Sequence, residues 1–207
     1  MTTAIESSAR EGGDSSDERA TGAKAGPRGR RSKQSFAQRL QSTRDLVGYT
    51  AQDEVRVRAT GDLLLPHADV IAGAVYDYLL SHPETAVHFT QADGRPDRDH
   101  LMIRTESLAV WLKRAITDPL DEPLSGYLAG IGRAHTRRDG SAARVHGRYL
   151  LATMSFVQTA LVGLLDPAIP DRADLLATIA AWNKLLMIHL DLFLAVYGSA
   201  EGNPHWY

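Results

Sequence analysis

Helical periodicity runs through almost the whole chain after residue 35, and it constrains the fold more than any other feature. Apolar residues recur at intervals of three and four, as in the series Ile71, Val75 and Leu79. No segment alternates strongly between apolar and polar residues over a useful length. No Asn-Gly or Asp-Gly turn joins two β-branched runs. The sequence therefore predicts an all-α fold of seven or eight helices.

Capping residues and prolines divide this pattern into separate helices. Thr50-Ala-Gln-Asp53 resembles a capping box with Asp in place of Glu. The segment 145–165 is apolar nearly all round, so we expect it to be the central, buried helix. The expected helices are a short leading one at 35–46 and later ones at 51–65, 66–81, 98–116, 124–138, 145–165 and 173–197.

Composition excludes several kinds of site. The 207 residues include no cysteine, which rules out disulfides, thiolate metal sites, thiol nucleophiles and covalently attached c-type haem. The net charge of −2 gives no sign of a nucleic-acid partner. Charged and polar residues interrupt the long apolar stretches, and the N-terminus lacks the apolar core of a signal peptide. We expect a soluble, cytoplasmic protein that binds neither nucleic acid nor membrane.

The first 34 residues differ in composition from the rest. They are rich in Ser, Gly, Ala and Arg and have almost no large apolar side chains, so we expect a disordered tail before a domain at 35–207. The basic run within this tail has two interpretations. It could contact a nucleic acid or an anionic surface, but a solvated tail is the favoured one.

A histidine stands at an inward position of the helix expected at 124–138. Leu124, Leu128, Ile131 and His135 are spaced four, three and four, which places them on one face. A buried imidazole needs a partner, and iron is one candidate. A core histidine bonded to a backbone carbonyl is the commoner case, and spacing alone leaves both open. His189 is the rival buried histidine.

Several motifs together resemble a known family. The stretch Tyr127-Leu-Ala-Gly-Ile-Gly-Arg-Ala-His135 is similar to the Y…iG-x-x-H segment of globin-coupled sensors and protoglobins. Upstream, the segments 49–53, 66–69, 75–80 and 83–85 resemble the opening helices of that family in order and spacing. The resemblance extends over about residues 35–198. It implies a protoglobin-like globin fold with an extra N-terminal helix, formed here by 35–46.

The resemblance also implies a cofactor and the residues around it. His135 would be the axial ligand of haem b iron, and Tyr76 the distal tyrosine. Leu108 and Trp111 would face the haem from the distal helix, and Phe156 would wall the ring. For these last three residues, ordinary core packing is nearly as good an explanation. The open sixth position of the iron would bind dioxygen, carbon monoxide or nitric oxide.

Three functional classes follow from this resemblance. The first is a gas carrier or sensor, the second a haem enzyme with peroxidase-like, nitric-oxide or nitrite activity, and the third a haem-free signalling module. Retention of His135 argues against the third. Because the chain ends at Tyr207, we expect a stand-alone globin. Relatives pair through their last two long helices, so we also expect a homodimer.

Overall fold

The computed structural model describes residues 34–91, 93–136 and 145–197. Within these ranges the chain is helical and has no β-strand, apart from an isolated bridge between Thr90 and Pro96. The all-α prediction is confirmed. The expected disorder of residues 1–34 concerns a segment that lies outside the described residues except for Gln34.

The helices follow the expected order, with short additional turns between them. They are α1 (Phe36–Leu46), α2 (Ala51–Ala59), α3 (Gly61–Leu64), the 3-10 turn η1 (Leu65–His67), α4 (Ala68–Leu80), α5 (Pro83–Ala86), the 3-10 turn η2 (Val87–Phe89), α6 (Arg98–Thr117), α7 (Glu122–Thr136), α8 (Gly147–Ala168) and α9 (Arg172–Leu194). The helix expected at 51–65 is interrupted at Thr60, where α2 ends and α3 begins.

Local hydrogen bonds explain where several of these helices begin. At α2 the Thr50 hydroxyl accepts from the backbone N–H of Asp53, and the Asp53 carboxylate accepts from the backbone N–H of Thr50 at 2.7 Å. Ser35 and Gln38 form the same reciprocal pair at α1. Asp171 caps α9 by accepting from the backbone N–H of Asp174. The capping box expected at Thr50 is therefore confirmed.

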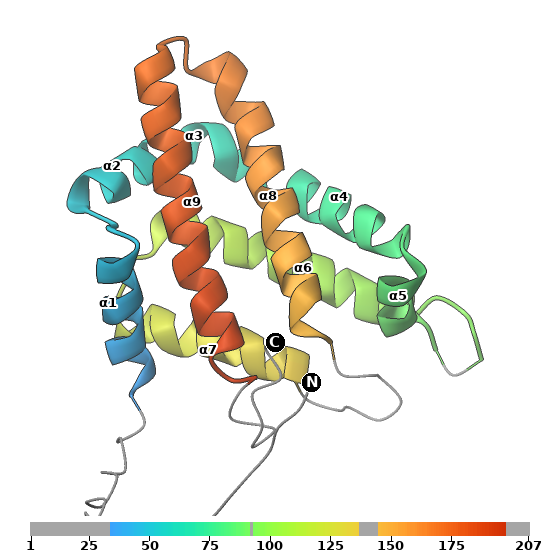
Figure 1. Ribbon diagram of the computed structural model, residues 1–207. Helices are drawn as coiled ribbons and strands as arrows, with labels where there is room; N and C mark the ends of the chain where they lie inside the picture. The colour runs from blue at the N-terminus through green and yellow to red at the C-terminus, as the bar shows by residue number, and fades with distance from the viewer. Residues whose placement is uncertain (1–33, 92, 137–144, 198–207) are drawn as a thin grey trace, which may run out of the picture. The chain divides into compact units, whose positions relative to one another are not determined.

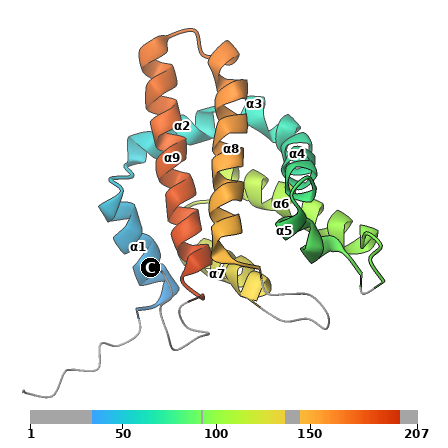
Figure 2. The same cartoon turned by 45° about the vertical axis from the view of Figure 1, so that its right-hand side comes forward.

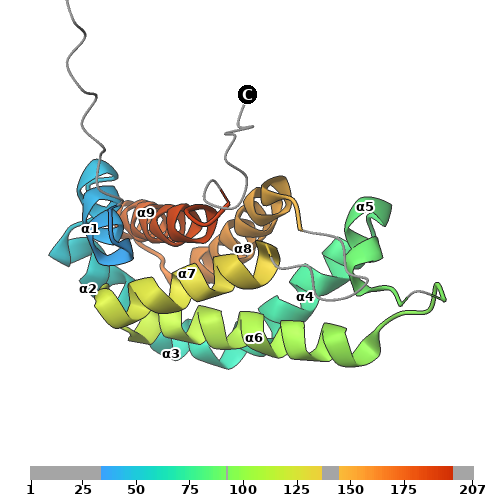
Figure 3. The ribbon, with the colours of Figure 1, turned by 90° about the horizontal axis from the view of Figure 1, so that it is seen from below.

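The last two long helices form an antiparallel pair joined at one end (Figure 1). Helix α4 packs against α6 and α8, while α7 packs against α9. Figure 2 shows α4 beside α8, and in Figure 3, seen from below, α7 lies next to the α8–α9 pair and α6 lies on the other side of α7. Four helices, α4, α6, α7 and α8, thus surround one region on the same side of the domain.

The central helix is α9, and not the segment at 145–165. Helix α9 packs against α1, α2, α7 and α8, and its buried residues fall on several faces. Helix α8 packs against α9, α4 and α3, and buries a single face. On its other face Leu151 is 49% exposed. The expectation of a buried helix at 145–165 is wrong because α8 lies at the edge of the helical domain.

Three helical stretches are long and apolar enough to cross a membrane by length and composition alone, namely 61–80, α8 and α9. Contrary to the expectation from the sequence, the charged and polar residues that interrupt the apolar stretches do not keep them below the length of a membrane span by this criterion. The stretch 61–80 is divided by the 3-10 turn at Pro66. Helix α9 is apolar because it lies in the interior of the domain. Of its most apolar 18-residue stretch, 56% is buried inside the fold.

Gly132 lies where α7 packs closely against α9. A Cβ atom added to Gly132 would lie 2.2 Å from the carbonyl oxygen of Phe193 and 2.8 Å from a methyl group of Val196. The first of these neighbours is backbone, which cannot turn away as a flexible side chain would. The glycine of the Ile-Gly-x-x-His stretch therefore lets α7 lie directly on α9.

We expect Gly132→Ala to destabilise the protein by about 1–3 kcal/mol or more, because α7 and α9 must separate to admit the methyl group. Gly126→Ala is the matched control on the same helix, since a Cβ there meets nothing within 4 Å. Its higher helix propensity should stabilise α7 by up to ~1 kcal/mol. Urea unfolding followed by circular dichroism compares the two variants. Equal stabilities would mean that the helices do not cross this closely in solution.

Candidate functional site

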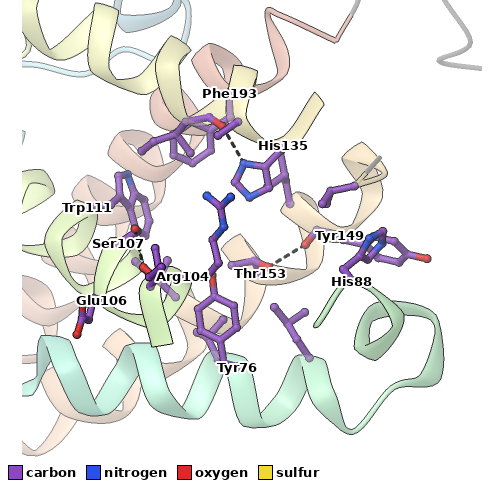
Figure 4. A pocket seen from close by; sticks show the side chains of 18 of the residues that line it. Tyr76, His88, Arg104, Glu106, Ser107, Trp111, His135, Tyr149, Thr153 and Phe193 are labelled. Atoms are coloured by element: carbon purple, nitrogen blue, oxygen red, sulfur yellow. Dashed lines mark hydrogen bonds between the residues drawn. The ribbon is translucent and has the colours of Figure 1, made fainter. Parts of the chain in front are cut away.

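A cavity of about 690 Å³ lies among α4, α6, α7 and α8, with η2 at its edge. Its walls are mainly apolar, and they include Val75, Leu79, Ile131 and Met154. This volume falls in the range of cavities that enclose an organic ligand of cofactor size. The polar side chains that reach the cavity are therefore the candidates for chemistry (Figure 4).

His135 enters the cavity from α7. Its Nδ1 lies 2.8 Å from the carbonyl oxygen of Ile131, one helical turn earlier. A carbonyl can only accept, so Nδ1 carries the proton and Nε2 keeps its lone pair. Burial lowers the pKa of His135, and Arg104 and His88 lower it further, against the opposing effect of the Ile131 hydrogen bond. The imidazole is therefore neutral at neutral pH, as a metal ligand must be.

The two sequence interpretations of His135 turn out to be compatible. The bond to the Ile131 carbonyl is the one expected of a core histidine. That same bond fixes the tautomer and orients the ring, as such bonds do for metal-bound histidines. Since the ring also lines the cavity, its second nitrogen is available to a ligand there.

The donor set fits a haem better than a bare metal ion. Among the described residues there is no group of three or more His, Asp, Glu or Cys side chains able to hold a metal ion. A haem needs only one axial ligand from the protein, because its porphyrin supplies the other four. One neutral imidazole on an apolar cavity of this size fits that requirement.

Tyr76 reaches the cavity from α4, on the side opposite His135 in Figure 4. Its ring contacts Phe89 edge-on, with centroids 5.4 Å apart. Burial raises the pKa of Tyr76 to about 12, although the nearby charge of Arg104 acts in the other direction. The phenol therefore stays protonated and can donate a hydrogen bond at any physiological pH.

Leu108, Trp111 and Phe156 have different places in the structure. Leu108 and Trp111 both line the cavity from α6. Phe156 is not a lining residue, and its ring packs against Tyr78 at a centroid distance of 5.1 Å. It lies seven residues after Tyr149, which places it roughly 10 Å further along α8 on nearly the same face. The place of Phe156 beside the cofactor stays a prediction, and in this structure its side chain lies where α8 packs against α4.

His189, the rival histidine, is fully buried behind the cavity wall and does not line the cavity. Its Nδ1 accepts from the indole N–H of Trp111 at 3.1 Å, so the ring proton is on Nε2. That Nε2 has no hydrogen-bond partner among the described residues. The hydrogen bond to His189 thus holds the indole of Trp111 on the side away from the cavity. His189 itself lies behind Trp111 and cannot reach a ligand in the cavity.

The burial of His189 should make stability depend on pH. Burial lowers the pKa of His189 to about 3, from about 6.5 in the unfolded chain. Between these values the unfolded state binds more protons, so stability falls as the pH drops below 6.5. From pH 7 to pH 5 this one group should cost about 2 kcal/mol of unfolding free energy.

The variant His189→Asn isolates this effect, because the amide oxygen can accept from Trp111 without titrating. We expect the loss of stability from pH 7 to pH 5 to be about 2 kcal/mol smaller in the variant than in the wild type. Urea unfolding of both haem-bound proteins at both pH values gives the double difference, in which the contributions of other groups cancel. An identical loss in both proteins would contradict the assignment.

Sequence reasoning missed Arg104, which reaches the cavity from α6. The spacing contained a signal for it. Arg104 precedes Leu108 by four residues and Trp111 by seven, so it shares the face already expected to point inward. A charged residue at such a position is easily assigned to the solvent, and the tertiary structure places it in the cavity wall.

Comparisons with known proteins give a family and a fold. The protoglobin family model matches residues 36–202. The globin domain of the Geobacter sulfurreducens globin-coupled sensor has a similar structure, with a TM-score of 0.66 and 23% sequence identity. The match covers 76% of this chain and 96% of that domain. The search of curated proteins gives no match.

Proposed function

We propose that this chain, which belongs to the protoglobin family, binds haem b through His135 and reversibly binds diatomic gases as a sensor or carrier. The observation that carries the proposal is the geometry of His135. Its Nδ1–H donates to the Ile131 carbonyl. Its Nε2 is therefore available to bind a ligand in the apolar cavity of about 690 Å³. The role proposed is binding rather than catalysis.

The residues around the cavity have separate tasks in this proposal. The haem, when bound, would supply an iron that takes up dioxygen, carbon monoxide or nitric oxide. His135 would hold and orient that group, since the Ile131 carbonyl fixes its ring. The apolar side chains exclude water, and Tyr76 offers a hydrogen-bond donor on the opposite side. Trp111, anchored by His189, keeps one wall in place.

An absorption spectrum tests the proposal directly. The purified protein, supplied with haem, should show a Soret band at a stoichiometry of one haem per chain. After reduction, this band should shift on exposure to carbon monoxide and return when the gas is removed. The proposal would be contradicted if the protein took up no haem, or if carbon monoxide did not shift the Soret band of the reduced protein.

The proposal includes a homodimer formed through the outer faces of α8 and α9. Leu151 on α8 and Leu176 on α9 are 49% and 52% exposed, respectively. Ser155 lies one turn after Leu151 and is also exposed, so the two share a face. Exposed leucines on both helices are the apolar side chains that an interface between copies would cover.

We expect the wild-type protein to be a dimer by light scattering at micromolar concentration. Ser155→Arg would bring a charge into that interface and should shift the mass to that of a monomer. Val55→Arg, at a 58% exposed position on α2, is the control and should remain dimeric. If the wild-type protein is a monomer, the proposed homodimer is wrong. If Ser155→Arg remains a dimer, the interface does not lie on the outer faces of α8 and α9.

A further inference from the structure

Arg104 is a cation in a mainly apolar cavity and lacks a carboxylate partner in the described part of the chain. Its Nε lies 3.4 Å from Nε2 of His100, and no ion pair joins its guanidinium to a described Asp or Glu. Six other arginines pair with carboxylates, namely Arg39, Arg56, Arg58, Arg95, Arg114 and Arg172. The positive charge of Arg104 is therefore available to interact with a ligand in the cavity.

The nearest acidic residue along α6 does not neutralise it. Glu106 follows by two positions, and residues spaced by two do not face each other on a helix. In Figure 4 the carboxylate of Glu106 points away from the Arg104 guanidinium. A cation that has no carboxylate partner is costly in a cavity that a ligand closes to water, and a bound anion offsets that cost.

A second donor lies beside Arg104. The hydroxyl of Tyr76 has no hydrogen-bond partner among the described residues, and Figure 4 shows the guanidinium between the Tyr76 ring and His135. The charge of Arg104 influences the pKa of both of these residues, which agrees with that position. A phenol O–H and a guanidinium together offer several donors and no acceptor, which is the arrangement an oxyanion requires.

We infer that Arg104 and Tyr76 form a binding site for a small inorganic anion, such as nitrite, inside the haem cavity. This inference rests on the proposed function, because it places the anion in the space between a haem held by His135 and the side chains of α4 and α6. It adds a class of ligand to the neutral gases. The guanidinium supplies paired N–H donors to two oxygens of the anion, and Tyr76 supplies one more.

The test is an equilibrium titration of the ferric, haem-loaded protein with nitrite, followed by its absorption spectrum. Arg104→Leu should weaken nitrite binding by about 10–150-fold, the range expected for a lost hydrogen bond to a charged group. Arg104→Lys keeps the charge without the fork of donors and should lie between the wild type and Arg104→Leu. Tyr76→Phe should weaken binding to a smaller extent.

Two controls separate this site from general effects. Lys113→Leu removes the same charge from α6, at a residue that pairs with Asp69 at 3.0 Å and does not line the cavity. It should leave nitrite affinity unchanged. Carbon monoxide, which is neutral, should bind the reduced Arg104→Leu protein with nearly wild-type affinity.

Other outcomes would overturn the inference. If Arg104→Leu keeps its nitrite affinity but loses haem faster to a competing apoprotein, then Arg104 pairs with a haem propionate, and no anion site exists. Wild-type affinity for nitrite in both Arg104 variants, with normal haem retention, would also refute the site. A chain that shows no Soret band on addition of haem would overturn the proposed function together with this inference, whereas the first two outcomes leave the proposed function intact.

Discussion

We expect the His135→Ala variant to purify without haem. Its affinity for added haem should be less than about a hundredth of the wild-type affinity. His135 lines the cavity, and its tautomer is fixed by the carbonyl oxygen of Ile131, which lies 2.8 Å from its Nδ1. Even the loss of an outer partner of a metal ligand costs about 10–100-fold in affinity, so the loss of the ligand itself costs more. Haem titration followed at the Soret band measures the effect.

Two further variants make this test specific. His135→Gly leaves a space for the lost ring, so added imidazole should restore haem binding and the wild-type reduced spectrum. His189→Asn changes the other buried histidine, which lies behind Trp111 and outside the cavity, and it should bind haem normally. A normal Soret band and five-coordinate reduced spectrum in His135→Ala would show that another residue is the ligand.

Tyr76→Phe is expected to release dioxygen about 10–150-fold faster than the wild type. Bound dioxygen is polar and accepts a hydrogen bond, and a bond of this kind is worth about 1.5–3 kcal/mol. Carbon monoxide is nearly apolar when bound, so its release rate should change much less. Because the pKa of Tyr76 is raised to about 12, the wild-type release rate should also stay constant between pH 7 and pH 10.

Stopped-flow measurements of both gases give the dissociation rates. Tyr78→Phe is the matched control on α4, because Tyr78 is 40% exposed and packs against Phe156 outside the cavity. It should leave both rates unchanged. Equal and small changes for the two gases in Tyr76→Phe would mean that Tyr76 only packs in the cavity wall, and that the donor to the bound gas is another lining residue, such as Arg104.

The helices could be predicted from the sequence because their determinants are local. A cap joins residues three positions apart, as Thr50 and Asp53 show, and this needs no information from the rest of the chain. The inward stripe of α4 is set by helical spacing, and its members Ala68, Ile71, Ala72, Val75 and Leu79 are all buried. The same spacing placed His135 on the inner face of α7.

Helical spacing identifies a face of a helix, but it does not say what that face meets. Phe156 and Tyr149 share nearly the same side of α8, and only Tyr149 lines the cavity. His189 occupies an inward position as His135 does, yet its partner is the Trp111 indole and not the cavity. Periodicity treats such residues alike, because it contains no information on position along the axis of a neighbouring helix.

The sequence by itself therefore determined the all-α class, most helix boundaries and the inward direction of His135, while Tyr76 was assigned through the family resemblance. Only the tertiary structure decided that α9 is the central helix, that Arg104 joins Tyr76 in the cavity and that Gly132 lies against the backbone of Phe193. The physical reason is the range of the interactions. Caps and stripes depend on residues within one or two turns, whereas a cavity is formed by helices far apart in the chain, whose crossing points depend on how all their side chains pack together.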